Sequence, residues 1–315
     1  MAVDESGATN AMALVATGLQ FPEGPIVLKD GRVLVVEIKT GTLAIAAPDG
    51  TVTRVATTGG GPNGAAVGPD GKIYVCNNGG FEWYDLDGLV APGPQPEDYI
   101  GGRIQRVDID TGVVEDLYME CDGHPLRGPN DIVFDTNGGF YFTDLGKSRA
   151  RDVDKGGIYY ALADGSSVRQ VAYPLDHPNG IGLSPDGTKL YVAETITGRV
   201  WTWDIESPGV VVDDATSPGP GRLLYNFVGY QLLDSMAIDG DGNVCVATLV
   251  TGAISVISPA GVLLDQYVVP EPDFFVTNVA FGGEGYRDAY ITSSGRGLLY
   301  RMTWPRDGLQ LNYEA

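Results

Sequence analysis

The sequence predicts an all-β fold: a six-bladed β-propeller with four antiparallel strands per blade and a metal ion in the central channel. Three observations predict it. The 45 glycines and 20 prolines recur along the chain between short runs rich in Val, Ile, Leu and Tyr, as is typical of all-β proteins. A segment of one plan recurs six times, and each copy carries an oxygen-bearing side chain at the same place.

Each recurring segment begins with an apolar residue or Pro and continues with Glu, Asn or Asp, an apolar stretch, a turn containing Gly and a second strand-like run. The six segments span residues 21–37, 61–77, 128–144, 177–194, 232–248 and 276–293. Turns such as KDG, PDG and TNGG supply the positive φ angles of tight hairpins. Each segment is therefore predicted to be a β-hairpin.

Two more strand-like runs follow the hairpins, as in GTLAIAAPDGTVTRVA, which gives four strands per unit. The aligned polar residues are 40 to 67 residues apart, a spacing that suits propeller blades with insertions. The run MALVATG near the N-terminus is predicted to add the outer strand to the blade containing LLYRMTW, which closes the ring. We expect one propeller domain over residues 1–315, with a flexible tail at 1–11.

Three insertions surround the second and third repeats, at residues 79–101, 118–127 and 145–156. We expect all three to be loops that cover one mouth of the channel. Functional residues often lie on such loops. In the first insertion, Trp83 is either part of an apolar lid over a substrate or part of a packed surface loop, and the sequence leaves both interpretations open.

The chain is strongly acidic, with a formal net charge of −21 and a pI near 4.2. Such a surface repels polyanions, so a nucleic-acid partner is excluded. The basic residues Lys147, Arg149 and Arg151 either attract an anionic substrate to the mouth or belong to a solvated loop, and the pattern favours the solvated loop.

No stretch of the sequence predicts a membrane segment, because the N-terminus lacks a basic start followed by a long apolar core and no uncharged apolar run approaches spanning length. We therefore expect a cytoplasmic protein without a membrane partner; the oligomeric state is left open. The three cysteines have no CxxC spacing and are predicted to be buried thiols. With only two histidines, a zinc site built from His and Cys cannot be assembled.

The six aligned polar residues predict a metal site. They are Glu23, Asn63, Asn130, Asn179, Asp234 and Asn278. Because the first strand of each blade lines the channel, these side chains should converge on its axis. In a dry cavity the two carboxylates would repel each other and the amides would lack partners, whereas a hard divalent cation accepts six to eight oxygens.

The oxygen ligands favour Ca²⁺ above all, with Mg²⁺, Mn²⁺ or oxygen-bound Zn²⁺ as alternatives. The competing interpretation is that Pro-Asn-Gly and Pro-Glu-Gly are only turn sequences leading into strands. Six copies at propeller spacing, two of them with a carboxylate where turn geometry does not require one, favour the metal site.

At these residues the sequence resembles the gluconolactonase and senescence marker protein (regucalcin) family of six-bladed propellers, which includes bacterial sugar-acid lactonases. The resemblance covers roughly residues 20–304, and its motifs are specific only in combination. They are FPEGP, VVEI, GPNDIVFD, HPNGIGLSPDG, LLDSMAID and TNVAFGG.

The resemblance implies that Glu23, Asn179 and Asp234 bind the metal, while Asn130 either completes the shell or holds the substrate and a water. It also implies an expected activity, the hydrolysis of a small lactone by metal polarisation of its carbonyl and attack of an activated water. Asp234 then serves either as the general base or only as a ligand. We count Asn130 and Asp234 as the catalytic candidates.

The residues expected to contact the substrate are Arg127, Asn63, Asn278, Trp83 and His177. Many relatives carry Arg two residues before the Asn130 position, where it binds substrate oxygens. This chain has Gly128 there and Arg127 one residue earlier, so recognition of a sugar acid is an open question. For His177, a structural role is favoured over a catalytic one.

Two alternatives accompany the lactonase hypothesis. One is an organophosphate hydrolase of the diisopropyl fluorophosphatase type, which shares the propeller and a carboxylate and Asn calcium site. The other is a non-enzymatic propeller that binds Ca²⁺ or a protein partner, which the acidic surface permits.

Overall fold

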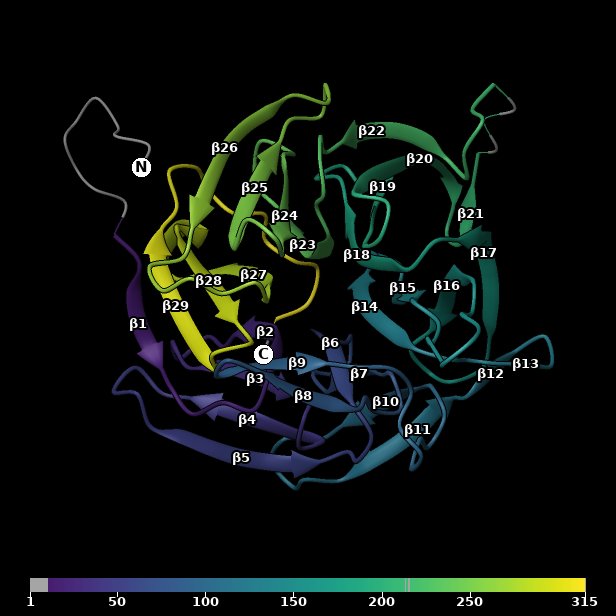
Figure 1. Cartoon of the computed structure of the whole chain (residues 1–315). Helices are drawn as coiled ribbons and strands as arrows, with labels where there is room; N and C mark the ends of the chain where they lie inside the picture. The colour runs from purple at the N-terminus through teal and green to yellow at the C-terminus, as the bar shows by residue number, and fades with distance from the viewer. Residues whose placement is uncertain (1–10, 213, 215, 315) are drawn as a thin grey trace.

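The computed structural model describes residues 11–212, 214 and 216–314, and their strands form a closed ring of six sheets (Figure 1). The inner strands follow one another round the axis in the order β2, β6, β14, β18, β23, β27, and β27 returns to β2. The predicted six-bladed propeller is therefore confirmed. The expected flexible tail lies outside the described residues, except for residue 11.

Each blade is an antiparallel sheet, and the first three are regular. Blade 1 contains β2 (Pro22–Val27), β3 (Val33–Glu37), β4 (Thr42–Ala46) and β5 (Val52–Thr57). Blade 2 contains β6 (Pro62–Val67), β7 (Ile73–Asn77), β10 (Arg103–Val107) and β11 (Val114–Tyr118). Blade 3 contains β14 (Pro129–Phe134), β15 (Gly139–Asp144), β16 (Gly156–Leu162) and β17 (Val168–Leu175).

The other three blades keep this order with two variations. Blade 4 contains β18 (Pro178–Leu183), β19 (Lys189–Glu194), β20 (Arg199–Ser207) and β22 (Arg222–Asn226), and β21 (Val210–Val211) also pairs with β20. Blade 5 contains β23 (Leu233–Ile238), β24 (Val244–Thr248), β25 (Ala253–Ile257) and β26 (Leu263–Val268). Blade 6 contains β27 (Val276–Gly282), β28 (Asp288–Ser293), β29 (Leu298–Thr303) and the N-terminal β1 (Ala13–Ala16), and the 3-10 helix η1 (Glu284–Tyr286) lies between β27 and β28.

The ring closes as the sequence predicts, because β1 pairs with β29 and Ala13 lies opposite Arg301. The core lies between neighbouring blades. Leu34 and Val36 of blade 1, for example, share one buried cluster with Ile73 and Val75 of blade 2. The second strand of a blade is apolar on both faces because it is covered on both sides.

The insertions depart in part from the expected loops. Residues 79–101 contain a hairpin, β8 (Trp83–Leu86) and β9 (Leu89–Pro92). Residues 118–127 contain a second hairpin, β12 (Glu120–Cys121) and β13 (His124–Pro125), which projects from the outer edge of the ring (Figure 1). The expectation that this second insertion covers the mouth is therefore wrong. None of the described helices is long and apolar enough to cross a membrane.

Three of the six aligned polar residues are followed by a glycine that packs against the backbone of the next blade. A Cβ on Gly24 would lie 2.7 Å from the carbonyl oxygen of Asn63, and one on Gly64 would lie 2.5 Å from that of Asn130. A Cβ on Gly180 would lie 2.7 Å from the carbonyl oxygen of Asp234. Glycine is needed here because the inner strands approach this closely.

Gly64→Ala is expected to lower the free energy of unfolding by about 1 to 3 kcal/mol, because backbone atoms of Asn130 and Asp131 must shift. Urea unfolding measures this loss. Gly240→Ala is the matched control, since its new Cβ would find its nearest neighbour at 3.1 Å. Equal losses in both variants would contradict the close packing at the axis.

Candidate functional site

The six aligned residues lie at β-bulges. In every inner strand the pairing with the second strand shifts by one residue at the aligned position, as between Glu23 and Ile26 in β2. A bulge redirects a side chain and increases the local twist. The repetition of one bulge in all six blades is the backbone feature that places one polar residue per blade at the same level of the channel.

We call these six residues the polar ring, and hydrogen bonds between neighbouring blades involve several of them. The Asn278 amide donates to Glu23 Oε2 at 2.7 Å, which links blades 6 and 1. The Ser235 hydroxyl donates to Asn179 Oδ1 at 3.4 Å, which links blades 5 and 4. Blades 3 and 4 are linked by Thr143 Oγ1, which donates to the Asn179 carbonyl at 2.6 Å.

Glu23 is almost completely buried, with 1 % of its surface exposed. Its Oε2 accepts hydrogen bonds from Asn278 Nδ2 and from the Gly24 N–H. Burial raises its pKa well above the ordinary value, and the charges of Asp234 and Asp131 raise it further. The three carboxyl groups therefore lie within electrostatic reach of one another.

Asp234 is the ring member that keeps partial exposure to solvent. Desolvation still raises its pKa to about 8, and hydrogen bonding to the Asn179 side chain partly opposes this. Its Oδ1 accepts the Ser235 N–H at 3.1 Å. A nearby cation would stabilise the ionised form of two buried carboxyl groups whose pKa values are raised in this way.

Several oxygens of the polar ring have no partner. Eight buried polar side-chain atoms of the described residues lack a hydrogen bond, and three of them are Glu23 Oε1, Asn63 Oδ1 and Asn130 Oδ1. Buried acceptors without partners are rare and costly. These three oxygens, together with the carboxyl group of Asp234, form an all-oxygen donor set of the kind that a hard divalent cation prefers, so these residues fit such an ion.

Within the described part of the chain, no group of three or more His, Cys, Asp and Glu residues is arranged to hold a metal ion. The candidate site therefore depends on amide oxygens beside its two carboxylates. The three cysteines are buried and free, as the sequence predicts.

Asn278 and Asn63 differ although both were expected to contact the substrate. Both ends of the Asn278 amide are used, because its Oδ1 accepts the Val279 N–H at 2.7 Å while its Nδ2 binds Glu23. It is placed to orient Glu23. Asn63 Oδ1 accepts no hydrogen bond from the described residues, and the same is true of one side-chain oxygen of each of the candidate ligands Asn130 and Glu23.

A second set of buried polar residues supports the ring from the ends of the second strands. Each of these side chains accepts a hydrogen bond from a backbone N–H group that lies two or three residues before the aligned residue of its blade. Glu37 accepts Gln20 N–H, Asn77 accepts Gly61 N–H, Asp144 accepts the N–H groups of Arg127 and Gly128, and Glu194 accepts Asp176 N–H. They fix the path by which the chain enters each inner strand.

The remaining predicted residues lie beside the mouth. His177 is 9 % exposed and has a positive φ of 55°, and burial lowers its pKa. The backbone of Arg127 is fixed by Asp144 and by the Tyr99 hydroxyl, while its residue surface is exposed. Trp83 is half-buried and packs on Phe21, with ring centroids 5.1 Å apart.

Sequence reasoning missed Asp131. It occupies the position that is glycine after Glu23, Asn63 and Asn179, and it is buried between blades 3 and 4. Its carboxyl accepts the N–H groups of Ile132 at 2.9 Å and Ile181 at 3.2 Å. Burial raises its pKa to about 7. The departure from glycine in GPND was the signal that could have found it.

The favoured interpretation of Lys147 as a solvated residue is wrong. Only 1 % of its surface is exposed, and its ammonium lies 3.8 Å from the centre of the Phe81 ring. Arg149 is ion-paired with Asp152 and Asp154, and Arg151 is exposed. Only part of the predicted basic cluster therefore belongs to a solvated loop.

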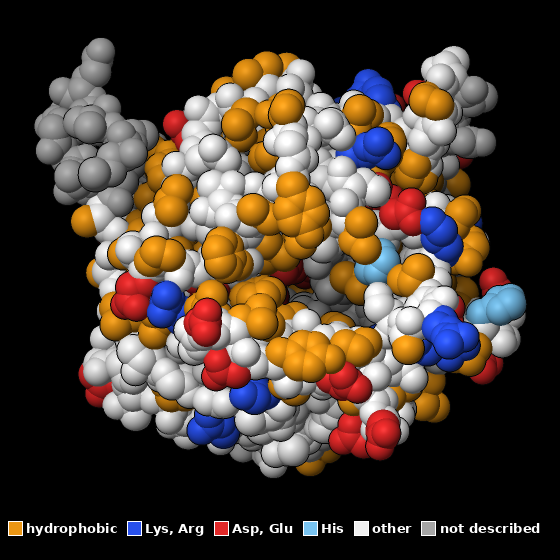
Figure 2. Space-filling model, viewed as in Figure 1, with side chains coloured by type: hydrophobic (Ala, Val, Ile, Leu, Met, Phe, Trp, Pro, Cys, Tyr) orange, Lys and Arg blue, Asp and Glu red, His pale blue; other side chains and the backbone are white. Residues whose placement is uncertain are grey.

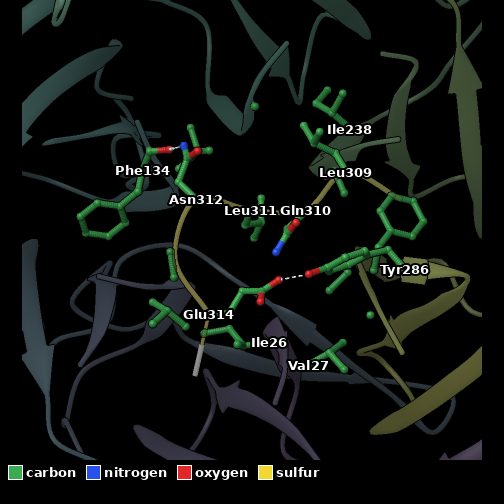
Figure 3. A pocket seen from close by; sticks show the side chains of 18 of the residues that line it. Ile26, Val27, Phe134, Ile238, Tyr286, Leu309, Gln310, Leu311, Asn312 and Glu314 are labelled. Atoms are coloured by element: carbon green, nitrogen blue, oxygen red, sulfur yellow. Dashed lines mark hydrogen bonds between the residues drawn. The ribbon is translucent and has the colours of Figure 1, made fainter. Parts of the chain in front are cut away.

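A cavity of about 1060 Å³ lies beyond the polar ring, at the opposite end of the channel from the insertions. The C-terminal segment crosses it (Figure 3). Asn312 Nδ2 donates to the Phe134 carbonyl at 2.8 Å, and the Tyr286 hydroxyl donates to Glu314. Asn278 is the one polar-ring residue in its lining, so this cavity lies below the site.

The mouth on the side of the insertions is apolar. Figure 2 shows hydrophobic side chains gathered around a central hollow, with Lys and Arg side chains farther out. Exposed apolar residues lie on the segments that lead into the inner strands, among them Val228 and Tyr230 before β23 and Phe274 before β27. A cation-poor, apolar rim favours neutral ligands over anions.

The sequence and the fold of this chain are similar to those of known proteins. Lactonase drp35 of Staphylococcus saprophyticus is 31% identical over 258 residues, which cover 81% of this chain and 72% of the relative. A gluconolactonase of Zymomonas mobilis is 28% identical over 311 residues, covering 89% and 78%. A solved gluconolactonase structure from Xanthomonas campestris has a TM-score of 0.72 at 21% identity and covers 93% of this chain and 89% of that one.

The family model described as the SMP-30/gluconolactonase/LRE-like region matches residues 21–295. This match spans all six inner strands and every residue of the polar ring. The chain belongs to the SMP-30/gluconolactonase/LRE-like family.

Proposed function

We propose that the protein is a divalent-metal-dependent hydrolase that opens a small lactone. The observation that carries the proposal is the set of unpartnered oxygens of Glu23, Asn63 and Asn130 beside the carboxyl of Asp234. The names of the two relatives, a drp35 lactonase and a gluconolactonase, support the reaction class.

Glu23, Asn130, Asn179 and Asp234 would hold the cation, with Ca²⁺ as the first expectation because all the donors are oxygens. A cation bound there supplies polarisation of an ester carbonyl and stabilisation of negative charge on the carbonyl oxygen in the tetrahedral intermediate. The protein contributes the dry, shaped site. Five of the six ring residues are buried, which holds their oxygens in place before a ligand arrives.

Asp234 is the ring residue best placed to handle a proton. It alone of the six is partly exposed as a residue, although its carboxyl group is desolvated, and the Ser235 N–H fixes that carboxyl. We assign it the acceptance of a proton from the attacking water. Asn130, with a free Oδ1, would orient that water or the substrate.

The mouth supports a neutral substrate with an apolar part. Its rim carries exposed Val228, Tyr230 and Phe274, and Gly128 occupies the position where many relatives have a substrate-binding Arg. We therefore expect a lactone with an alkyl or aryl group to be opened more efficiently than δ-gluconolactone. An equal or reversed ratio of kcat/KM would remove this part of the proposal.

Metal removal tests the reaction itself. Exhaustive chelation, with metal loss verified by elemental analysis, is expected to abolish lactone opening, and Ca²⁺, Mg²⁺, Mn²⁺ or Zn²⁺ added singly identifies the ion that restores it. The same assays include an organophosphate substrate. Hydrolysis of the organophosphate in place of the lactone would indicate an activity of the diisopropyl fluorophosphatase type. Full lactonase activity in the verified metal-free protein would contradict the proposal.

A further inference from the structure

Lys147 is a buried lysine outside the polar ring. It lies between β15 and β16 and inserts its side chain into the insertion between β7 and β10. Its Nζ donates to the Gly80 carbonyl at 2.6 Å and to Asn78 Oδ1 at 3.2 Å. The Phe81 ring, with its centroid 3.8 Å from Nζ, takes the remaining side of the ammonium.

Burial of the Lys147 ammonium costs desolvation free energy. None of the described acidic residues lies within ion-pair distance of Nζ, so the charge is held only by two neutral oxygens and an aromatic face. Burial lowers the pKa of Lys147 to about 7, and the charge of Asp144 partly opposes this. An apolar side chain would fill the same space without the desolvation cost.

The residues that Lys147 contacts begin the segment that carries the hairpin β8–β9. Phe81 packs edge-on against Trp83, with ring centroids 6.2 Å apart, and Trp83 packs on Phe21. Phe21 precedes Glu23 by two residues and also packs against Phe275, 5.8 Å away. A continuous line of aromatic contacts thus connects the ammonium to the entrance of the polar ring.

The far end of the hairpin is attached to another blade. The Val90 N–H donates to the Gly295 carbonyl of blade 6 at 2.8 Å. The near end is tied to the Lys147 segment a second time, because the Gln95 N–H donates to the Ser148 carbonyl at 2.9 Å. The segment that carries the hairpin is therefore bonded to blade 3 at one end and to blade 6 at the other. Between these two attachments it packs beside the entrance to blade 1, where Trp83 contacts Phe21.

We propose that Lys147 is a positioning residue that holds the hairpin β8–β9 against the mouth, so that Phe81 and Trp83 form a fixed wall for the apolar part of the substrate. The inference rests on the proposed lactonase function. Lys147 acts through the hairpin and does not contact the reacting atoms, because its own surface is closed to solvent. Its loss should therefore weaken substrate binding more than the chemical step.

The test compares Lys147→Met and Lys147→Arg in the full chain. Lys147→Met is expected to raise KM for an alkyl or aryl lactone roughly tenfold, the scale of a desolvated cation–aromatic contact, with kcat and metal content changed much less. Lys147→Arg keeps the charge and should recover part of the loss. Lys155→Met removes an exposed, ion-paired lysine of the same segment and is the matched control.

Amide hydrogen exchange of residues 79–101 gives a readout that does not depend on activity. We expect faster exchange of these residues in Lys147→Met and exchange like that of the wild type in Lys155→Met. That result would support the role of Lys147 in holding the hairpin β8–β9. Unchanged exchange and unchanged KM in Lys147→Met would overturn it. If the wild type opens no lactone at all, the proposed function fails, while the exchange measurement still decides whether Lys147 holds the hairpin.

Discussion

Glu23→Gln is expected to abolish tight metal binding and to lower kcat/KM for a lactone by roughly 10³-fold or more. The substitution keeps the size of the side chain and removes one of the two negative charges that balance a divalent cation. A bound cation contributes several kcal/mol of transition-state stabilisation, and about 1.4 kcal/mol corresponds to a factor of ten. Steady-state kinetics and elemental analysis of the same preparation measure both effects.

Glu37→Gln is the matched control for this substitution. Glu37 is equally buried in the same blade, but Arg54 and Thr42 occupy its carboxylate, with Arg54 Nε at 2.7 Å. We expect this variant to lose stability while keeping its metal and its turnover number. Normal metal content and normal kcat/KM in Glu23→Gln would show that Glu23 is not part of the functional site.

The stability of the metal-free protein is expected to fall as pH rises from about 4 to 8. Burial raises the folded-state pKa of Asp131 to about 7 and of Asp234 to about 8, above ordinary unfolded values near 4. The folded state therefore binds protons more tightly than the unfolded chain. The contribution of these two carboxyl groups to the free energy of unfolding is complete below their pKa in the unfolded chain. It is lost as the pH rises through their pKa in the folded protein.

A bound cation should reverse this trend, because it stabilises the ionised carboxylates. Since a shift of one in pKa is worth about 1.4 kcal/mol, the increase in Tm on adding the metal should be small at pH 5 and large at pH 8. Thermal unfolding with and without metal across this range measures it, and Asp234→Asn should flatten the metal-free profile. A metal-induced increase in Tm that does not change with pH would contradict the account.

Much of the fold could be predicted because each blade repeats the same local rules. The Asp-Gly and Asn-Gly turns, the apolar second strands and the spacing of the aligned residues predicted six hairpins, and the structure has them. The pairing of the N-terminal run MALVATG with the strand in LLYRMTW followed from the need to close the ring. The members of the polar ring could be predicted from the alignment of the six repeats, because each occupies the same position in its inner strand.

What could not be predicted depends on contacts between segments far apart in the sequence. Lys147 looks like part of a charged loop, and its burial arises only because residues 78–81 fold over it. Asp131 looks like a turn residue, and its importance comes from Ile181 in the next blade. The hairpin β12–β13 likewise projects from the outer edge of the ring, a direction that its sequence did not reveal (Figure 1).

The supporting residues show an intermediate case. Glu37, Asn77, Asp144 and Glu194 end four aligned segments in the sequence, so their register was visible. Their task was not, because it depends on the N–H groups of the chain entering each inner strand. Only the three-dimensional contacts show that these residues act together.

The most direct test of the central claim is a crystal structure of the protein with Ca²⁺ or Mn²⁺, using anomalous scattering to locate the ion. The account predicts a single strong peak on the propeller axis, within about 2.0 to 2.6 Å of oxygens from Glu23, Asn179 and Asp234. An axis without an ion at saturating metal, or an ion bound only at other residues, would contradict it.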